Sequence, residues 1–215
     1  MAANRSTTAD RRARIEEMRR AEQSRERRNR ILTIGVSAVV VLSLVGFGGW
    51  VLTKENDKKE QQEAAAKAPI KDEKSWDAKK LTRNHVTTPV KYEMTPPVGG
   101  DHNPVWQNCN GDVYDKPVDD TNAVHALEHG AVWVTYNKKA APADVEKLSA
   151  KVKKTPYSLM SPVDGQSGAI MLSAWGKQVT VDGASDPRVD AFFTKYVNGP
   201  QTPEPGAACT GGVGQ

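Results

Sequence analysis

The longest apolar pattern in the chain runs from Ile31 to Leu52 and contains no charged residue. A helix of this length reaches roughly 30 Å, the thickness of the hydrocarbon core of a bilayer. Arginines precede the segment and a mixed-charge run follows it, which is the asymmetry of the positive-inside rule. The pattern predicts one transmembrane helix over residues 31–53, with the N-terminus in the cytoplasm and the C-terminal part outside. A cleaved signal peptide is the alternative, but its apolar core is usually shorter.

The remaining pattern divides the chain further. Residues 54–75 are mostly Lys, Glu, Gln and Ala, a composition typical of a polar linker, helical or disordered. Residues 76–215 contain enough periodic apolar positions to bury a core of their own. The expected organisation is a basic cytoplasmic tail over residues 1–30, the transmembrane helix over residues 31–53, the linker, and one extracytoplasmic domain.

Within residues 76–215, alternating and 3.6-residue periodicities predict short strands and helices in mixed order. Capping signals fix several helix ends: Gly130 follows one helix, Pro142 opens another, and Ser185 or Asp186 precedes the last. The predicted strands are 86–92, 131–136, 168–175 and 177–182. One short helix is predicted within 119–130, with Thr121 or Asn122 as its cap, and two more helices over 142–154 and 187–198. Because regular βαβ alternation is absent, we expect an α+β domain with a small mixed or antiparallel sheet.

Charge is concentrated at the N-terminus, which narrows the choice of partners. Residues 1–30 contain ten arginines and five acidic residues, whereas the whole chain has a net charge of only +4. The basic character therefore belongs to the tail and does not indicate that the protein binds nucleic acid. We expect membrane lipid to be the partner of residues 31–53 and of the basic tail.

Cys109 and Cys209 are the only cysteines, and both lie in the part expected outside the cytoplasm. Oxidising compartments favour pairing, so a disulfide is the expected state. It would close a loop of about 100 residues and contribute roughly 4–5 kcal/mol. A thiolate metal ligand or redox thiol is the alternative.

All four histidines fall between residues 85 and 129. His125 and His129 are spaced i, i+4, so a helix would place both imidazoles on one face, close enough to share a metal ion. His102 belongs to a long loop rich in Pro and Gly, a type that is often functional, and could add a third ligand. His85 is a candidate fourth. The pattern predicts a transition-metal site, with copper or zinc as the ion.

Three further residues extend this hypothesis. Met94 and Met160 are candidate ligands if the ion is copper, although methionine more often fills gaps in a core. Glu128 completes an H-x-x-E-H motif, as an additional ligand or as the general base of a metal-dependent hydrolase. That enzyme needs a longer helix and an open coordination position, whereas this helix is expected to end at Gly130. A metal-binding protein without turnover is therefore favoured over the hydrolase.

A third hypothesis needs no metal. Histidines commonly serve as internal hydrogen-bonding groups, so the chain could be a structural or interaction protein with another envelope protein as its partner. The metal hypothesis assigns the domain to metal handling or envelope assembly.

Several motifs in one order resemble the domain-of-unknown-function family 3105, whose bacterial members often follow one membrane helix and have no established activity. They are PPVGGDH (96–102), VHALEHGAVWVTY (124–136), SAWGK (173–177) and PEPGAAC (203–209). The resemblance covers about residues 80–209, with Gly99 at a position where the family often has serine. It implies that the family's signature positions here are His85, His102, His125, Glu128, His129 and Trp175.

Overall fold

The computed structural model describes residues 3–214, apart from the side chains of residues 3–10, 38–39, 42, 45–46, 48–49, 51–53 and 55–67. The chain separates into two compact units, Met1–Glu60 and Gln61–Gln215. The described residues form four helices and one six-stranded mixed sheet. The α+β class predicted from the sequence is therefore confirmed for the second unit.

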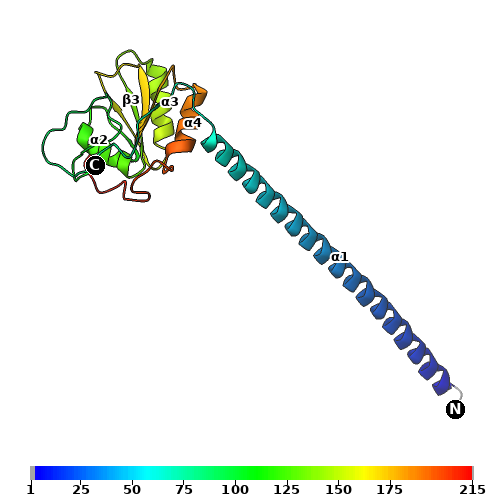
Figure 1. Cartoon of the computed structure of the whole chain (residues 1–215). Coiled ribbons are helices and arrows are strands. Elements are labelled where there is room, and N and C mark those ends of the chain that lie inside the picture. Colours follow the sequence, from blue (N-terminus) through cyan, green and yellow to red (C-terminus); the bar gives the residue numbers. More distant parts are fainter. Residues whose placement is uncertain (1–2, 215) are drawn as a thin grey trace. The chain divides into compact units, whose positions relative to one another are not determined.

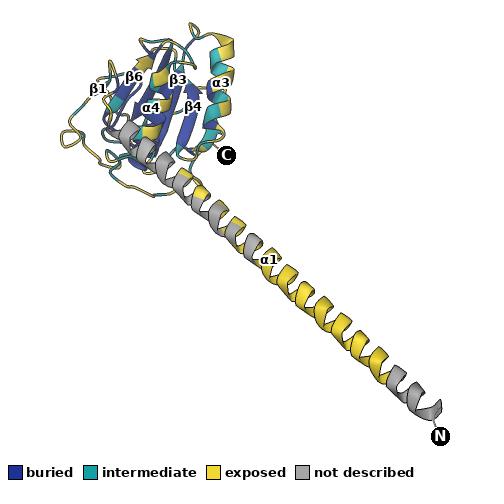
Figure 2. Ribbon diagram, turned by 90° about the vertical axis from the view of Figure 1, so that its right-hand side faces the viewer, coloured by how far each residue is buried: buried dark blue, intermediate teal, exposed yellow. Residues whose placement is uncertain are grey.

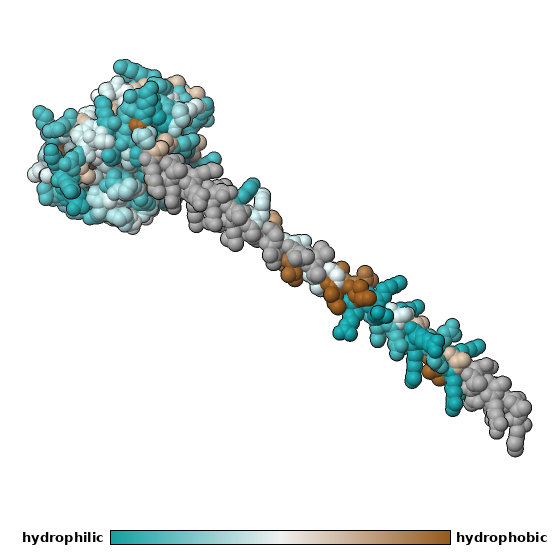
Figure 3. Space-filling model, turned by 45° about the vertical axis from the view of Figure 1, so that its right-hand side comes forward, coloured by the Kyte–Doolittle hydropathy of each residue, from teal (hydrophilic) through white to brown (hydrophobic). Residues whose placement is uncertain are grey.

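The first helix, α1, is continuous from Ala3 to Lys67. The uncharged run that starts at Ile31 forms no separate element, because α1 continues into charged residues on both sides of it. Apolar and charged side chains consequently follow one another along the same exposed helix (Figure 3). No helix among the described residues is apolar over a length that could cross a membrane. The predicted transmembrane helix over residues 31–53, and the single-pass topology based on it, are wrong.

The sheet is mixed, with four five-residue strands at its centre and a shorter strand at each edge. Strands β3 and β4 pair in parallel, as do β4 and β2, whereas β3–β5, β5–β6 and β6–β1 are antiparallel. The strand order is β1 (Lys74–Ser75), β6 (Lys177–Val181), β5 (Ile170–Ala174), β3 (Val132–Tyr136), β4 (Ser158–Pro162) and β2 (Asn110–Val113). The two strands predicted on either side of Gly176 are present and pair as the hairpin β5–β6, and the positive φ of 66° at that residue suits glycine.

Helices cover both faces of this sheet (Figure 1). Helix α3 (Pro142–Val152) and helix α4 (Pro187–Tyr196) lie on one face, and helix α2 (Asp120–Glu128) lies on the other. Pro142 and Asp186 begin α3 and α4 as predicted, since proline suits the first turn and an aspartate side chain accepts from a free amide. The predicted cap of α2, Thr121 or Asn122, is wrong, because Asp119 is the cap and accepts from the amide of Thr121 at 2.8 Å.

The alternation of side chains along β3 separates two cores. Val132 and Val134 pack with residues of α3 and α4, whereas Trp133 between them packs with α2. All three are fully buried, and Figure 2 shows the buried residues gathered in the sheet. The second core supports α2, which carries most of the predicted site.

Two predictions about the strands fail. Residues 86–92 form no strand, and an isolated bridge pairs the preceding residue, His85, with His102. Pro89 within that segment has no amide hydrogen to donate, so it does not suit a paired strand. Strand β4 was missed because its sequence, SLMSP, lacks apolar alternation, although Ser158 and Ser161 are buried.

Candidate metal centre

Helix α2 carries three of the candidate site residues into the interior. Glu128 and His129 follow His125 by about one turn, and all three are buried, with exposed fractions of 4% or less. His129 is the C-cap residue, and its amide donates to the carbonyl of His125 at 3.2 Å. Gly130 then ends the helix with a φ of 100°, which a residue with a side chain rarely adopts. The short helix thus brings two imidazoles and one carboxylate close together in the interior.

Two further imidazoles come from the loop layer next to α2. His85 and His102 face each other across a parallel bridge. The amide of Val86 donates to the His102 carbonyl at 2.8 Å, and the amide of His102 donates to the Asn84 carbonyl at 3.0 Å. These bonds fix two segments that are distant in sequence and place their rings 5.0 Å apart between centroids.

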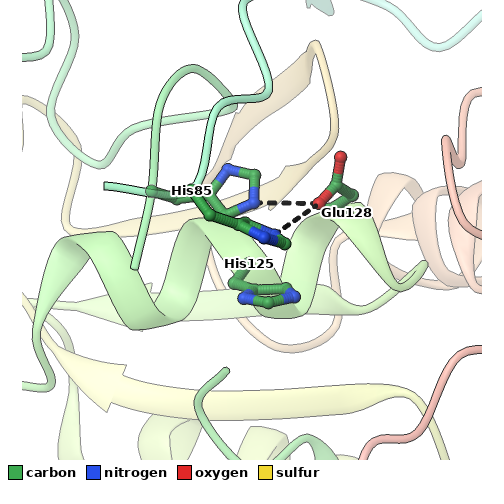
Figure 4. A group of neighbouring side chains, drawn as sticks. His85, His125 and Glu128 are labelled. Carbon is green, nitrogen blue, oxygen red and sulfur yellow. Dashed lines mark ion pairs between the residues drawn. The ribbon is translucent and has the colours of Figure 1, made fainter. Parts of the chain in front are cut away.

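The loop layer and α2 together form one group of potential ligands. Single nitrogen or oxygen atoms of His85, His102, His125 and Glu128 all lie within 4.8 Å of one another. Figure 4 shows the His85 ring over the His125 ring, with the Glu128 carboxylate beside them. Ligand atoms at about 2.0–2.1 Å from a tetrahedral ion are roughly 3.3 Å apart. A modest contraction of the group would therefore suffice to hold an ion.

Backbone carbonyls orient the two buried imidazoles. The Nδ1 atom of His102 lies 2.7 Å from the carbonyl of Gly100, and the Nδ1 atom of His125 lies 2.6 Å from that of Asn103. A carbonyl only accepts, so Nδ1 carries the proton in both rings, by inference from the hydrogen bonds. In a neutral ring the Nε2 lone pair is then free. This arrangement is characteristic of histidines that ligate metals.

The closest approach in the group is between His102 and Glu128. Nε2 of His102 lies 2.8 Å from Oε2 of Glu128, yet its direction does not satisfy a hydrogen bond, and it is a buried nitrogen without an aligned partner. A small rotation of the ring would align the pair. A lone pair on Nε2 facing a carboxylate oxygen requires either a proton or a cation between them. The donor set and this buried atom therefore fit a metal ion.

The buried charges are distributed unequally over the group. Burial alone would raise the pKa of the Glu128 carboxyl, but His102 and Arg83 outweigh it and lower that pKa. Burial opposes protonation of His102 too, but Glu128 and the Gly100 carbonyl raise its pKa. Burial lowers the pKa of His125 to about 4, and neighbouring imidazoles add to this effect. Glu128 is thus an anion, and His125 is a neutral imidazole, at neutral pH.

His129 lies beside this group and is not among the four residues that converge. Its ring is 4.5 Å from that of His125, but its Nδ1 atom is 2.7 Å from the carbonyl of Ala208. Its Nε2 atom lies 3.9 Å from Oε2 of Glu204. Burial lowers the pKa of His129. The i, i+4 spacing thus brings two rings together, while a distant carbonyl directs the second one elsewhere.

The two predicted methionines occupy different places. Met160 is fully buried in β4, within the core that faces α3 and α4. Met94 is half-buried and lines a pocket together with Gly100 and Asp101, just before His102. Trp175 stands with its ring edge-on to His102, 6.0 Å between centroids.

Arg83 is a site residue that the sequence analysis missed. Its guanidinium Nη1 atom lies 4.0 Å from Oε1 of Glu128, and its side chain is half exposed. Nothing in the pattern around it marks it, because the pairing depends on where the irregular segment before His85 passes α2.

The predicted disulfide is present and fixes the C-terminal segment next to the group. Cys109 and Cys209 are bonded, and the amide of Cys109 also donates to the Cys209 carbonyl at 2.9 Å. The same segment supplies the Ala208 carbonyl to His129 and the amide of Glu204 to the carbonyl of Glu128, at 3.1 Å. The disulfide therefore supports the C-terminal end of α2.

Comparison with known proteins identifies a family whose function is unknown. Neither the curated proteins nor the solved structures contain a match to this chain. Residues 85–211, which include all four histidines, Glu128 and both cysteines, match the family described as protein of unknown function (DUF3105). Because this match covers more than half of the sequence, the chain belongs to the DUF3105 family.

Proposed function

We propose that the domain binds one divalent transition-metal ion through His85, His102, His125 and Glu128. The observation that carries the proposal is the convergence of their ligand atoms within 4.8 Å. The carbonyls behind two of the rings support it, because they leave Nε2 as the free ligand atom. The role we infer is metal handling or envelope assembly, without turnover.

The types of ligand atom limit which metal ions the site could hold. Three imidazole nitrogens and one carboxylate oxygen suit Zn²⁺ or Cu²⁺ better than Cu(I), which prefers thiolate and thioether ligands. Both cysteines are used in the disulfide, so no thiolate is offered. We infer zinc or copper(II), with zinc favoured by the four-ligand count of a closed tetrahedral site.

The exposure of the ligands indicates how an ion would enter. The side chain of His85 is 47% exposed, whereas those of His102 and Glu128 are buried. An ion would reach the buried ligands past His85, which would then close the site. A ligand at the surface on an irregular segment suits exchange of the ion better than permanent retention.

The disulfide indicates in which cellular compartment the domain works. Disulfides persist in oxidising environments and are rare where thiols are kept reduced. We infer that the domain works outside the cytoplasm, where it could receive or deliver an ion.

A metal-dependent hydrolase is supported less well. In that alternative, Glu128 would be a general base beside a metal held by His125 and His129. Here the carboxylate of Glu128 lies among the converging ligand atoms, and His129 does not. We therefore propose Glu128 as a ligand.

Zinc titration of the metal-free full-length chain tests the proposal. We expect one Zn²⁺ per chain, and a stabilisation of about 2.7 kcal/mol at a free zinc concentration 100 times Kd. His85→Ala should weaken binding at least tenfold and leave the fold intact, because this side chain is exposed.

The comparison variant is His129→Gln. His129 lies one turn from His125 and is about as buried as His125, but it is not one of the four proposed ligands. It should keep one zinc per chain with an affinity close to wild type, while circular dichroism verifies that it is folded. Wild-type protein that binds no zinc or copper would leave the histidines as internal hydrogen-bonding groups. Equal losses in both variants would show that the group of four is not the site.

A further inference from the structure

A pocket of about 300 Å³ lies against the candidate metal centre. Its lining includes Arg83 and Trp175, which also contact the ligand group itself. Pro203, which also lines the pocket, precedes Glu204, whose amide donates to the carbonyl of Glu128. The pocket and the candidate metal centre therefore share a wall.

The lining of this pocket has one sign of charge and a largely apolar surface. Lys79 and Arg83 are its charged residues, and the described lining includes no acidic side chain. Leu81, Trp175 and Pro203 supply apolar surface. A cationic group beside an apolar wall is complementary to an organic anion, and a guanidinium matches a carboxylate in two parallel hydrogen bonds.

A metal ion would change what Arg83 can bind. Without an ion, the Arg83 guanidinium faces the Glu128 carboxylate at 4.0 Å, so this carboxylate is an anionic partner of Arg83. With a divalent ion on Glu128 and three neutral imidazoles, the centre carries a net charge of +1, because the carboxylate offsets only one of the two charges. Arg83 then has no anionic partner in the centre and adds a second positive charge beside it. Loading the centre thus favours an anion in the adjacent pocket.

We propose that the metal-loaded protein binds a small organic monocarboxylate in this pocket, with its carboxylate on Arg83 and its apolar body against Trp175. This inference rests on the proposed metal site and adds a ligand class to it. A volume of about 300 Å³ is at the lower end for ligand sites, so it suits a single ring or a short aliphatic acid. Metal and acid bind cooperatively, since each strengthens the field that the other meets.

The test is ¹⁹F NMR titration of 4-fluorobenzoate into the full-length chain, zinc-loaded and metal-free, with zinc content measured separately. The zinc-loaded protein should bind 4-fluorobenzoate at least tenfold more tightly than the metal-free protein. It should bind the uncharged 4-fluorobenzamide at least tenfold more weakly than the acid. A short peptide ending in a free phenylalanine carboxylate distinguishes a peptide C-terminus from a free acid as the natural source.

Arg83→Gln is the decisive variant, because it removes the guanidinium from an exposed segment and leaves all four proposed ligands in place. It should retain one zinc per chain and lose at least tenfold in affinity for 4-fluorobenzoate. Lys138→Gln, which removes an exposed cation elsewhere, should behave as wild type.

Failure of this inference differs from failure of the metal site. Zinc bound at one per chain without a preference for the acid over the amide would overturn the acid site and leave the metal site standing. Equal affinity for the acid with and without zinc would overturn the coupling proposed here. A chain that binds no metal would overturn both.

Discussion

Removing the disulfide should destabilise the domain mainly through its unfolded state. We consider Cys109→Ala/Cys209→Ala, since alanine introduces no hydroxyl that would need a partner in these buried positions. In the folded protein, the C-terminal segment keeps other anchors. Tyr157 donates to the carbonyl of Ala207 at 3.0 Å, and the amide of Val213 donates to the carbonyl of Trp106 at 3.0 Å. We therefore expect the variant to fold with the segment in place.

The magnitude follows from the length of the loop. The two cysteines are 100 residues apart, and closing a loop of that length contributes about 4.7 kcal/mol in the chain-entropy treatment. For a domain of this size, each kcal/mol corresponds to about 2–4 °C in Tm. The variant should lose about 10–20 °C.

Urea unfolding of the full-length chain, followed by tryptophan fluorescence, measures this difference. The m-value should rise slightly, because an open unfolded chain exposes more surface. Wild-type protein in a reducing agent should match the variant, and the reducing agent should not affect the variant. A loss of stability below about 1 kcal/mol would refute the reasoning, since the disulfide would then not be constraining the unfolded chain.

Three more predictions concern α2 and its surroundings. The pKa of His125 is about 4 in the folded metal-free protein and near 6.5 when unfolded, so the unfolded state takes up the proton first as pH falls. Stability present above pH 6.5 should therefore be lost between pH 6.5 and 4, by up to about 3 kcal/mol, and urea unfolding of wild type against His125→Gln measures it. Gly130→Ala should lower the free energy of unfolding by about 1–3 kcal/mol, because φ is 100° and a Cβ would lie 2.5 Å from Oδ1 of Asn198. The decrease in Tm measures this loss. Trp133→Phe removes the indole N–H that donates to Oγ of Ser161 at 3.0 Å. The buried hydroxyl then lacks its donor, so the free energy of unfolding in urea should fall by about 1–3 kcal/mol.

Each of these has its own control. His125→Gln should show no loss specific to the imidazole, so equal pH profiles for the two proteins would contradict the pKa argument. Gly165→Ala serves as the comparison for Gly130, because its added Cβ meets only ordinary contacts and its φ is unstrained. Combining Trp133→Phe with Ser161→Ala should recover part of the loss, and strictly additive losses would show that the hydrogen bond contributes little.

The elements that the sequence predicted have local signals. Helix α4 follows an aspartate cap and a proline and repeats its apolar positions every three or four residues, and the β5–β6 hairpin turns at a glycine. Strand β4 lacked such a signal, because what makes it a strand is its pairing with β3, established through tertiary contacts. The apolar run is helical as its pattern predicts, but it is part of the long helix α1, and the predicted membrane span is wrong.

The candidate site was predictable as a cluster and not as a ligand set. Helical spacing indicates that His125 and His129 share a face, but it does not direct their rings. Ring direction depends on the carbonyls of Asn103 and Ala208, which come from segments far from α2 in sequence. The place of Glu128 likewise depends on the loop that carries His102.

The bridge between His85 and His102 has a consequence for local opening. The four potential ligands come from three segments, around His85, around His102 and in α2, so an ion on all of them would act as a removable cross-link. The amides of Val86 and His102, bonded across the bridge, should then exchange with deuterium more slowly when the ion is present. Faster exchange of these two amides in the metal-free protein would show that the bridge opens locally.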